Sequence, residues 1–266
     1  MKYCRFLLNG QSAYGLVEGA EGSARITRTL MKAPHSTEDD IEDLPSRKIE
    51  SRPLQGAELL APVEPSKIIC VGRNYREHAA ELGNEVPAEP LLFFKPPSSL
   101  LATGMTVRRP KLSQRVDHEG ELGVVIRRKC YKLSPDEDVR TYIRGYTCVN
   151  DVTARDLQNK DGQWTRAKGF DTFCPVGPLV TDELDPWAGV EVETRVNQDV
   201  RQKGNTRDFI FPLDVIIRYI SQAMTLCPGD LIATGTPKGV GPLHAGERVS
   251  VTVESVGTLS NPVEDE

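Results

Sequence analysis

The sequence predicts an α+β protein in which β-strands dominate. Short apolar segments bounded by turn residues recur along the chain, whereas only one segment has a clear helical period. The 19 prolines and 22 glycines favour many short strands and turns over a regular alternation of strands and helices. With 266 residues, the chain is long enough for one large domain, or for one medium domain with a small appendage.

Composition and charge exclude several classes of protein. The formal net charge of −5 argues against a nucleic-acid binder, which needs a basic face to neutralise phosphates. No segment approaches the roughly 18 apolar residues that span a bilayer, and the apolar run at residues 6–8 is too short for a signal peptide. The six cysteines stand singly, without the close pairs of a zinc site or a disulfide framework. We therefore expect a cytoplasmic protein that binds neither nucleic acid nor membrane.

The first 62 residues have the pattern of a small β-rich domain. Two apolar segments at residues 3–8 and 13–17 flank Asn9-Gly10, a pair that tolerates positive φ and is typical of a hairpin turn. Residues 32–53 are polar and lack a clear period, which indicates a linker or an irregular extension. We expect this small domain and linker at residues 1–62, and the main domain at residues 66–266.

The main domain has the pattern of several strands and few helices. A short helix is expected after its first strand, ending at Gly83 and Asn84, which are common helix stops. The clearest helix covers residues 213–224, where apolar residues follow a 3.6-residue spacing, and Pro228-Gly229-Asp230 stops it. The predicted strands cover residues 68–71, 91–94, 122–126, 146–149, 190–196, 231–233 and 249–253.

Glu119 and Glu121 flank Gly120 at the start of a predicted strand. If this segment is extended, both carboxylates lie on one face, with Cα atoms roughly 6.6–7 Å apart, and Gly120 leaves the opposite face open to a close approach. Two such carboxylates repel each other unless a cation lies between them. Asp151, after another predicted strand, supplies a third ligand. Oxygen-only ligands favour Mg²⁺, with Mn²⁺ or Ca²⁺ as alternatives, and argue against zinc. The spacing also fits two ordinary solvent-facing glutamates.

The residues after Asp151 can form one or two helical turns. Asp151, Arg155 and Gln158 then lie on one helix face at positions i, i+4 and i+7. Arginine is suited to binding a carboxylate through two parallel hydrogen bonds. The alternative is an intrahelical Asp–Arg ion pair, which contributes little to stability. Lys168 adds a further positive charge in a loop bounded by Gly and Pro.

His78 and Glu81 lie at positions i and i+3 of the short predicted helix. They can share a helix face and form a hydrogen bond. A carboxylate that holds one imidazole nitrogen leaves the other nitrogen free to take a proton from water. The polar segment at residues 76–90 suits a lid over a site. The alternative is a solvated surface helix.

Six motifs, in matching order over residues 66–256, resemble those of the fumarylacetoacetate hydrolase family. The similarity is closest to its acylpyruvase and oxaloacetate decarboxylase branch, and to its hydroxymuconate and heptadienedioate isomerases. The motifs are G-R-N-Y-x-E-H-x-x-E at 72–81, L-L-F-F-K-P at 91–96, H-E-x-E-L-G-V-V at 118–125, N-D-V-T-A-R-D-L-Q at 150–158, A-K-G-F-D at 167–171 and T-G-T-P-x-G-V-G at 234–241.

The resemblance implies a mixed β-roll or sandwich fold and a homodimer. It implies that Mg²⁺ or Mn²⁺ is held by the residues that match the family's metal ligands, namely Glu119, Glu121 and Asp151. Substrate oxygens would be bound by Arg155, Gln158 and Lys168, and the substrate carboxylate by Thr236. His78 and Glu81 match the pair that activates water in the hydrolytic members. The glycine-rich turn around Thr236 lacks the pattern of a phosphate-binding loop, which argues against nucleotide binding.

Three functions are compatible with these residues. The first is a metal-dependent hydrolase that cleaves a C–C bond in a 2,4-dioxo acid of the acylpyruvate or fumarylpyruvate type, through a metal-stabilised enolate, and that also decarboxylates oxaloacetate. The second is an isomerase or tautomerase of 2-oxo or 2-hydroxymuconate-type dicarboxylic acids. The third is a binding protein without activity, which would have lost a ligand or the His78–Glu81 pair. All three metal ligands and the His78–Glu81 pair are present, so an enzyme acting on a small oxo acid is expected.

Overall fold

A computed structural model describes residues 1–20, 22–81 and 85–266, and it confirms a β-rich α+β fold. The described strands form three sheets, with twelve, five and three strands, in which parallel and antiparallel pairs are mixed. None of the helices in these residues is long and apolar enough to cross a membrane. The predicted helix stop at Gly83 and Asn84 lies outside the described residues.

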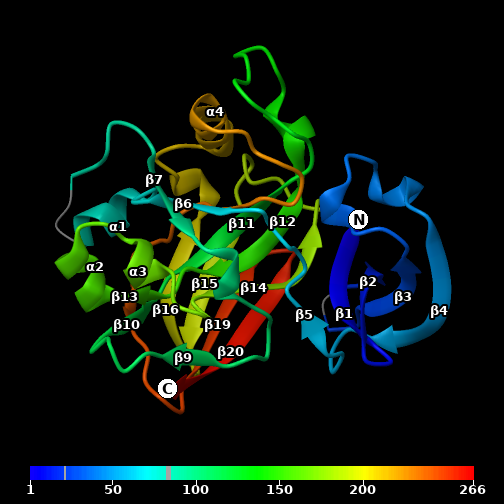
Figure 1. The fold of residues 1–266 in the computed structure, drawn as a ribbon, viewed down its shortest axis with the longest axis horizontal. Coiled ribbons are helices and arrows are strands. Elements are labelled where there is room, and N and C mark those ends of the chain that lie inside the picture. The colour runs from blue at the N-terminus through cyan, green and yellow to red at the C-terminus, as the bar shows by residue number, and fades with distance from the viewer. Residues whose placement is uncertain (21, 82–84) are drawn as a thin grey trace.

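The N-terminal strands lie at one side of the molecule (Figure 1). They are β1 (Lys2–Leu8), β2 (Gln11–Glu18), β3 (Arg25–Leu30), β4 (Ser46–Pro53) and β5 (Leu59–Leu60). The predicted hairpin is confirmed, because β1 and β2 pair up to Leu8 and Gln11, and the two turn residues have φ angles of 53° and 78°. The expectation of an irregular segment at residues 32–53 was wrong for residues 46–53, because β4 pairs with β3 there, whereas residues 32–45 contain only turns and 3₁₀ turns. β4 is an edge strand with one apolar residue, Ile49, so it has no apolar alternation.

The large sheet continues from the N-terminal strands into the centre of the molecule. Its order is β4-β3-β2-β1-β14-β12-β11-β17-β6-β7, and β5 and β8 pair with β1 and β14 beside this path. The central strands are β6 (Ile68–Gly72), β7 (Leu91–Lys95), β8 (Leu100–Leu101), β11 (Gly120–Ile126), β12 (Ile143–Asn150), β14 (Cys174–Thr181) and β17 (Leu231–Ala233). Because β1 pairs with β14, the sheet crosses the boundary expected between residues 62 and 66, and the division into two domains stays a prediction.

Two smaller sheets and four α-helices complete the fold of the described residues. The five-stranded sheet contains β9 (Val107–Arg109), β15 (Glu191–Val196), β16 (Asp199–Asn205), β19 (Arg248–Val253) and β20 (Gly257–Asp265). The three-stranded sheet contains β10 (Val116–His118), β13 (Thr153–Ala154) and β18 (Gly241–Pro242). The α-helices are α1 (Arg76–Glu81), α2 (Arg155–Asp161), α3 (Thr165–Lys168) and α4 (Leu213–Ala223), and the 3₁₀ turns are η1 (Pro34–Ser36), η2 (Ile41–Asp43), η3 (Pro97–Ser99), η4 (Val139–Tyr142) and η5 (Thr206–Asp208).

The five-stranded sheet packs face to face on the central strands, and their apolar side chains form one core. Leu122 and Val124 of β11 belong to the same buried cluster as Val251 of β19. The two layers approach most closely at Gly120, where an added Cβ would lie 1.9 Å from the Thr194 hydroxyl oxygen. The expected close approach at Gly120 is therefore present, and it fixes the position of the segment that carries both glutamates. Helices α1, α2 and α3 gather at the side of the molecule away from the N-terminal strands (Figure 1).

Candidate active site and metal centre

Glu119, Glu121 and Asp151 meet at one end of the β11–β12 pair. The antiparallel register places Gly120 opposite Asn150, and the N–H of Asp151 donates to the carbonyl of Glu119 over 2.8 Å. One carboxylate oxygen from each of the three residues lies within 4.8 Å of the others. Their exposed fractions are 5%, 2% and 0%. Three buried carboxylates at this separation are the arrangement that the spacing of the two glutamates suggested.

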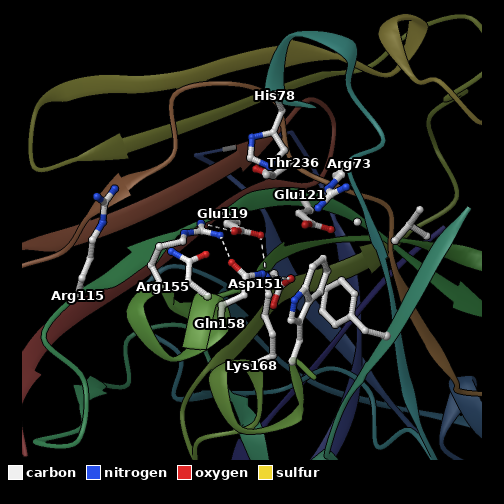
Figure 2. Close-up of a pocket in the computed structure, with 15 residues that line it drawn as sticks. Arg73, His78, Arg115, Glu119, Glu121, Asp151, Arg155, Gln158, Lys168 and Thr236 are labelled. Atoms are coloured by element: carbon white, nitrogen blue, oxygen red, sulfur yellow. Dashed lines mark hydrogen bonds and ion pairs between the residues drawn. The ribbon is translucent and has the colours of Figure 1, made fainter. Parts of the chain in front are cut away.

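These carboxylates line a pocket of about 470 Å³, a size that suits a small metabolite. The other predicted site residues on its wall are His78, Arg155, Gln158, Lys168 and Thr236. Glu81 does not line the pocket but contacts His78. Figure 2 shows Arg155, Gln158 and Lys168 on one side of the carboxylates and His78 on the other. The structure therefore brings together residues from five separate parts of the chain.

Two buried cations contact the carboxylates directly. The Lys168 ammonium donates to Glu119 over 2.9 Å and to Asp151 over 2.6 Å. The Arg155 guanidinium donates to Glu119 over 2.5 Å, to Asp117 over 2.9 Å and to the Gln158 amide oxygen over 2.6 Å. The last contact leaves the Gln158 amide nitrogen as a donor for a ligand. Among these partners, the buried Asp117 was not predicted as part of the site, and its role is to hold Arg155.

Lys95 is a further residue that the sequence did not indicate. Its ammonium is 1% exposed and donates to Asp151 over 2.6 Å and to the Val152 carbonyl over 3.0 Å. The signal that could have found it is a lysine at the end of an otherwise apolar strand, L-L-F-F-K, because a buried lysine requires an anionic partner. Asp151 is therefore held between two lysines.

The three carboxylates differ in their proton affinities. Burial raises the pKa of Glu119, but the charges of Lys168 and Arg155 outweigh burial and hold this pKa below its usual range. Burial raises the pKa of Glu121 well above its usual value, and the charges of Asp151 and Glu119 raise it further. Glu121 accepts a hydrogen bond from the N–H of Gly235, and no lysine or arginine among the described residues forms an ion pair with it. A divalent cation beside Glu121 would compensate this buried charge, so the donor set fits the expected metal.

Two local expectations about secondary structure were wrong. Asp151 is not helical, because β13 follows it and α2 begins only at Arg155. The side chains still converge, since Arg155 and Gln158 lie at i and i+3 of α2 and the strand end directs Asp151 into the same pocket. Lys168 is the last residue of α3 rather than part of a loop, and its N–H donates to the Trp164 carbonyl.

His78 and Glu81 form the expected pair on α1. The Nδ1 atom of His78 lies 3.3 Å from a Glu81 carboxylate oxygen, and the His78 side chain is buried. Glu81 also accepts hydrogen bonds from the N–H of Gly239, which connects α1 to the turn that carries Thr236. Because Nδ1 faces Glu81, Nε2 is the His78 nitrogen that is left for a ligand in the pocket.

Thr236 lines the pocket, but its hydroxyl group already has two protein partners. The hydroxyl donates to the Gly120 carbonyl over 2.9 Å and accepts from the Gln202 amide over 2.7 Å. Gln202 was not predicted as part of the site. These contacts fix the turn against the glutamate segment, and contact between Thr236 and a substrate carboxylate stays a prediction.

Buried carboxylates and cations thus surround a pocket of the size of a small metabolite, and comparison with known proteins identifies the family. Residues 67–264 match the family model for the fumarylacetoacetate hydrolase C-terminal domain. The chain belongs to the fumarylacetoacetate hydrolase family, as the six motifs indicated.

Relatives in this family have different reactions in their names. The chain is 42% identical over 224 residues to the oxaloacetate tautomerase YisK of Bacillus subtilis, covering 79% of this chain and 74% of that one. It is 39% identical to the 2,4-didehydro-3-deoxy-L-rhamnonate hydrolase of a Sphingomonas strain, covering 100% of this chain and 96% of that one. It is similar to the crystal structure of a 5-carboxymethyl-2-hydroxymuconate δ-isomerase from Mycobacterium smegmatis, with a TM-score of 0.88, 40% identity and full coverage of both chains. Membership of the family therefore leaves the reaction open.

Proposed function

We propose that this protein is a divalent-metal-dependent hydrolase that cleaves a C–C bond in a 2,4-dioxo acid. The observation that carries this proposal is that His78, paired with Glu81, lies on the wall of the pocket that holds the carboxylate cluster. Hydrolysis needs a base for water as well as a site for the oxo acid, and this pocket contains a candidate for each. Mg²⁺ as the metal, a homodimer and a cytoplasmic location are part of the proposal.

Glu119, Glu121 and Asp151 would hold the metal. When bound, a divalent cation supplies a Lewis acid that withdraws electron density from the substrate oxygens. The surrounding cations bind and orient the acid. Burial lowers the pKa of Lys168, but Asp151 and Glu119 raise it above its usual value, so this ammonium stays protonated. Lys168, Arg155 and the Gln158 amide would then donate hydrogen bonds to the carboxylate and carbonyl oxygens.

His78 would act as the general base. Glu81 accepts a hydrogen bond from Nδ1–H and fixes the ring, so that Nε2 takes a proton from water. The water oxygen attacks the carbonyl at C4, and the C3–C4 bond breaks. The electron pair of this bond remains on the 2-oxo fragment, where Lys168 stabilises the negative charge until C3 takes up the proton that His78 removed from water. The products are a carboxylic acid and a 2-oxo acid.

Isomerisation or tautomerisation is the second candidate function, together with decarboxylation of oxaloacetate. It is supported by the relatives named as an oxaloacetate tautomerase and a hydroxymuconate isomerase. These reactions need the same oxo-acid site, but they move a proton or release CO₂ without the attack of water. Their dependence on His78 differs from that of hydrolysis. In tautomerisation, His78 would move a proton of the substrate instead of a proton of water. In decarboxylation, His78 would not be needed.

The metal dependence is tested with acetylpyruvate, fumarylpyruvate and oxaloacetate, each with MgCl₂ or with EDTA. We expect metal-dependent turnover of at least one acylpyruvate, measured as pyruvate release in a coupled assay. Glu121→Ala should abolish metal binding in calorimetry, because it removes one of three ligands. If none of the three acids showed metal-dependent turnover or tautomerisation, the proposal would be wrong.

The water-activating role is tested with His78→Ala. This variant should bind the metal as the wild-type protein does, because His78 is not one of the three carboxylates. Its hydrolytic kcat should fall by about 10²- to 10⁴-fold, the usual contribution of a general base. If His78→Ala hydrolysed acylpyruvates at the wild-type rate, the role assigned to the imidazole would be wrong. If it lost only tautomerisation, the second candidate function would replace the first.

A further inference from the structure

Arg73 occupies an unusual backbone conformation at the edge of the pocket. Strand β6 ends at Gly72, and Arg73 follows with a φ of 57°, in the left-handed region. Glycine adopts this region without penalty, whereas for a residue with a Cβ this conformation is higher in free energy. A non-glycine residue in such a conformation is informative when the surrounding structure enforces it.

The neighbouring residues enforce this conformation. Asn74 is fully buried, and its amide donates to the carbonyls of Phe211 and Thr234 over 3.2 Å and 2.8 Å. Its amide oxygen accepts from the N–H of Phe211 over 2.8 Å, and its carbonyl accepts from the N–H of Ile210 over 2.8 Å. Four hydrogen bonds thus fix the chain directly after Arg73, and β6 fixes it directly before. The backbone directs the side chain at position 73 to the pocket wall.

The charge of Arg73 is available to a ligand. Lys168, Arg155 and Arg115 also line the pocket, and each pairs with a carboxylate; for Arg115 the partner is Asp117, over 2.9 Å. For Arg73, the described part of the structure contains no ion pair and no side-chain hydrogen bond. Arg73 and Arg115 lie at opposite ends of the labelled residues in the view of Figure 2.

An aromatic wall lies beside Arg73. Phe93 and Trp164 stack edge to face with ring centroids 5.1 Å apart, and both line the pocket. An added Cβ at Gly72 would lie 3.2 Å from the Trp164 ring, so this ring covers the end of β6. The Lys168 ammonium, which contacts the carboxylates, lies 4.9 Å from the Phe93 centroid. The pocket that holds the carboxylate cluster therefore also presents an apolar wall and the guanidinium of Arg73.

We propose that Arg73 is a specificity-determining residue that binds a carboxylate at the end of the substrate's tail. The preferred substrate is then a 2,4-dioxo acid whose tail carries a second, terminal carboxylate. This inference rests on the proposed function, because it takes the carboxylate cluster as the site of the oxo-acid head. A guanidinium is suited to the task because it binds a carboxylate through two parallel hydrogen bonds.

The test compares succinylpyruvate with butyrylpyruvate, which differ only in a terminal carboxylate in place of a methyl group. Arg73→Gly removes the guanidinium and tolerates the left-handed backbone, so this variant should fold. It should lower kcat/KM for succinylpyruvate by about 10- to 100-fold, mainly through KM, as expected for the loss of a charge-assisted hydrogen bond. For butyrylpyruvate, kcat/KM should change by less than about threefold. Arg73→Lys should lie between Arg73→Gly and the wild type.

Lys132→Gly is the matched control, because Lys132 also has a positive φ, of 54°, and lies outside the pocket. It should leave the kinetics of both acids unchanged. Equal losses for both acids in Arg73→Gly would overturn the inference, because a residue that only balances the charge of Glu121 would affect both. A wild-type protein that hydrolyses both acids equally well would also overturn it, while leaving the proposed function intact.

Calorimetry separates this inference from the proposed function. Should the wild-type protein hydrolyse neither acid, the binding of both is measured with the Mg²⁺-loaded protein. Tighter binding of succinylpyruvate than of butyrylpyruvate in the wild type, but not in Arg73→Gly, would support the inference although the hydrolytic function had failed. Equal affinities of the wild type for the two acids would overturn the inference.

Discussion

The charged residues around Asp151 show how a buried site can be stable before a metal is bound. Lys95 and Lys168 each donate a hydrogen bond of 2.6 Å to one oxygen of this carboxylate. A buried charge without a partner is costly, and removal of one partner of a buried ion pair commonly destabilises a protein by about 3–5 kcal/mol. The two lysines therefore stabilise Asp151 in the metal-free protein, and they oppose a cation at the same place.

Lys95→Met tests this double role. We expect the variant to unfold at lower urea concentration without metal, with a loss of about 3 kcal/mol in the free energy of unfolding. MgCl₂ should then stabilise the variant more than the wild type, because one positive neighbour of the metal site is gone. Urea titrations with and without MgCl₂ measure both effects.

Lys67→Met is the control for Lys95→Met. Lys67 forms an ion pair with the buried Asp230, away from the pocket. Its removal should also lower stability, but the increment from MgCl₂ should equal that of the wild type. Equal magnesium increments in Lys95→Met and the wild type would contradict a metal site beside Asp151.

At the scale of elements, the position of the glutamate segment depends on contact between two sheets. Gly120 of β11 lies against Thr194 of β15 and Val251 of β19. A methyl group at position 120 would overlap the Thr194 oxygen and press on the valine, whose two methyl carbons would each lie 3.2 Å away. The distance between these layers thus sets where Glu119 and Glu121 lie.

Gly120→Ala should therefore separate the layers and disturb the carboxylate cluster. We expect a loss of about 2 kcal/mol or more in the free energy of unfolding, measured by urea titration, together with weaker metal binding in calorimetry. The double variant with Thr194→Ala should recover part of the stability, because the overlapping oxygen is absent. Gly241→Ala is the control, since its nearest contact would be 3.7 Å away. Wild-type stability of Gly120→Ala would contradict the tight packing.

Elements with a strong local signal could be predicted from the sequence. The Asn9-Gly10 turn, the apolar segment of β6 and the helical period of α4 each encode their structure within a few residues. Strands such as β4 and β16 could not be predicted, because they lie at sheet edges and carry few apolar side chains. Pairing with a neighbour distant in sequence, rather than local pattern, makes them strands.

The candidate site could be predicted in part for the same reason. Glu119 and Glu121 are close in sequence, so their spacing predicts a shared face, and the i, i+3 spacing of His78 and Glu81 predicts their pairing. Asp151 is distant in sequence, and its position after a predicted strand makes it only a candidate for the third ligand until the six motifs are considered. Lys95 at the end of β7 meets Asp151 although β6, β17 and β11 separate β7 from β12 in the sheet, so this contact depends on the order and the curvature of the sheet rather than on spacing in the chain. Contacts that depend on sheet order have no local signal in the chain.

At the scale of the whole molecule, His35 links the N-terminal strands to the central body. Its ring lies 5.3 Å from that of Tyr14 in β2, and a Cβ on Gly229 would lie 2.8 Å from the imidazole. The side chain is 4% exposed, and its Nδ1 atom has no hydrogen-bond partner in the described part of the structure. The imidazole is thus buried in its neutral form.

Stability should therefore fall as the pH decreases from about 7 to 4. Burial is the main cause that lowers the pKa of His35 from 6.5 to about 4; Glu64 opposes this shift, and Arg5 and Arg144 add to it. Because the unfolded chain takes up a proton near pH 6.5 and the folded chain does not, the loss reaches about 3 kcal/mol. His35→Gln should flatten the dependence by this amount in urea titrations over the same range. His244→Gln, at an exposed histidine, should leave it unchanged.

The pairing of β1 with β14 has a consequence for the solubility of the chain. β14 is buried along its whole length, and its outer side is covered by β1 at Thr181 and Val180 and by β8 at Cys174 and Pro175. Without β1, the peptide groups near Thr181 would form an open apolar edge, onto which a strand of another copy could add. By covering this edge, the N-terminal strands oppose aggregation of the central sheet, and this role is independent of any chemistry in the pocket.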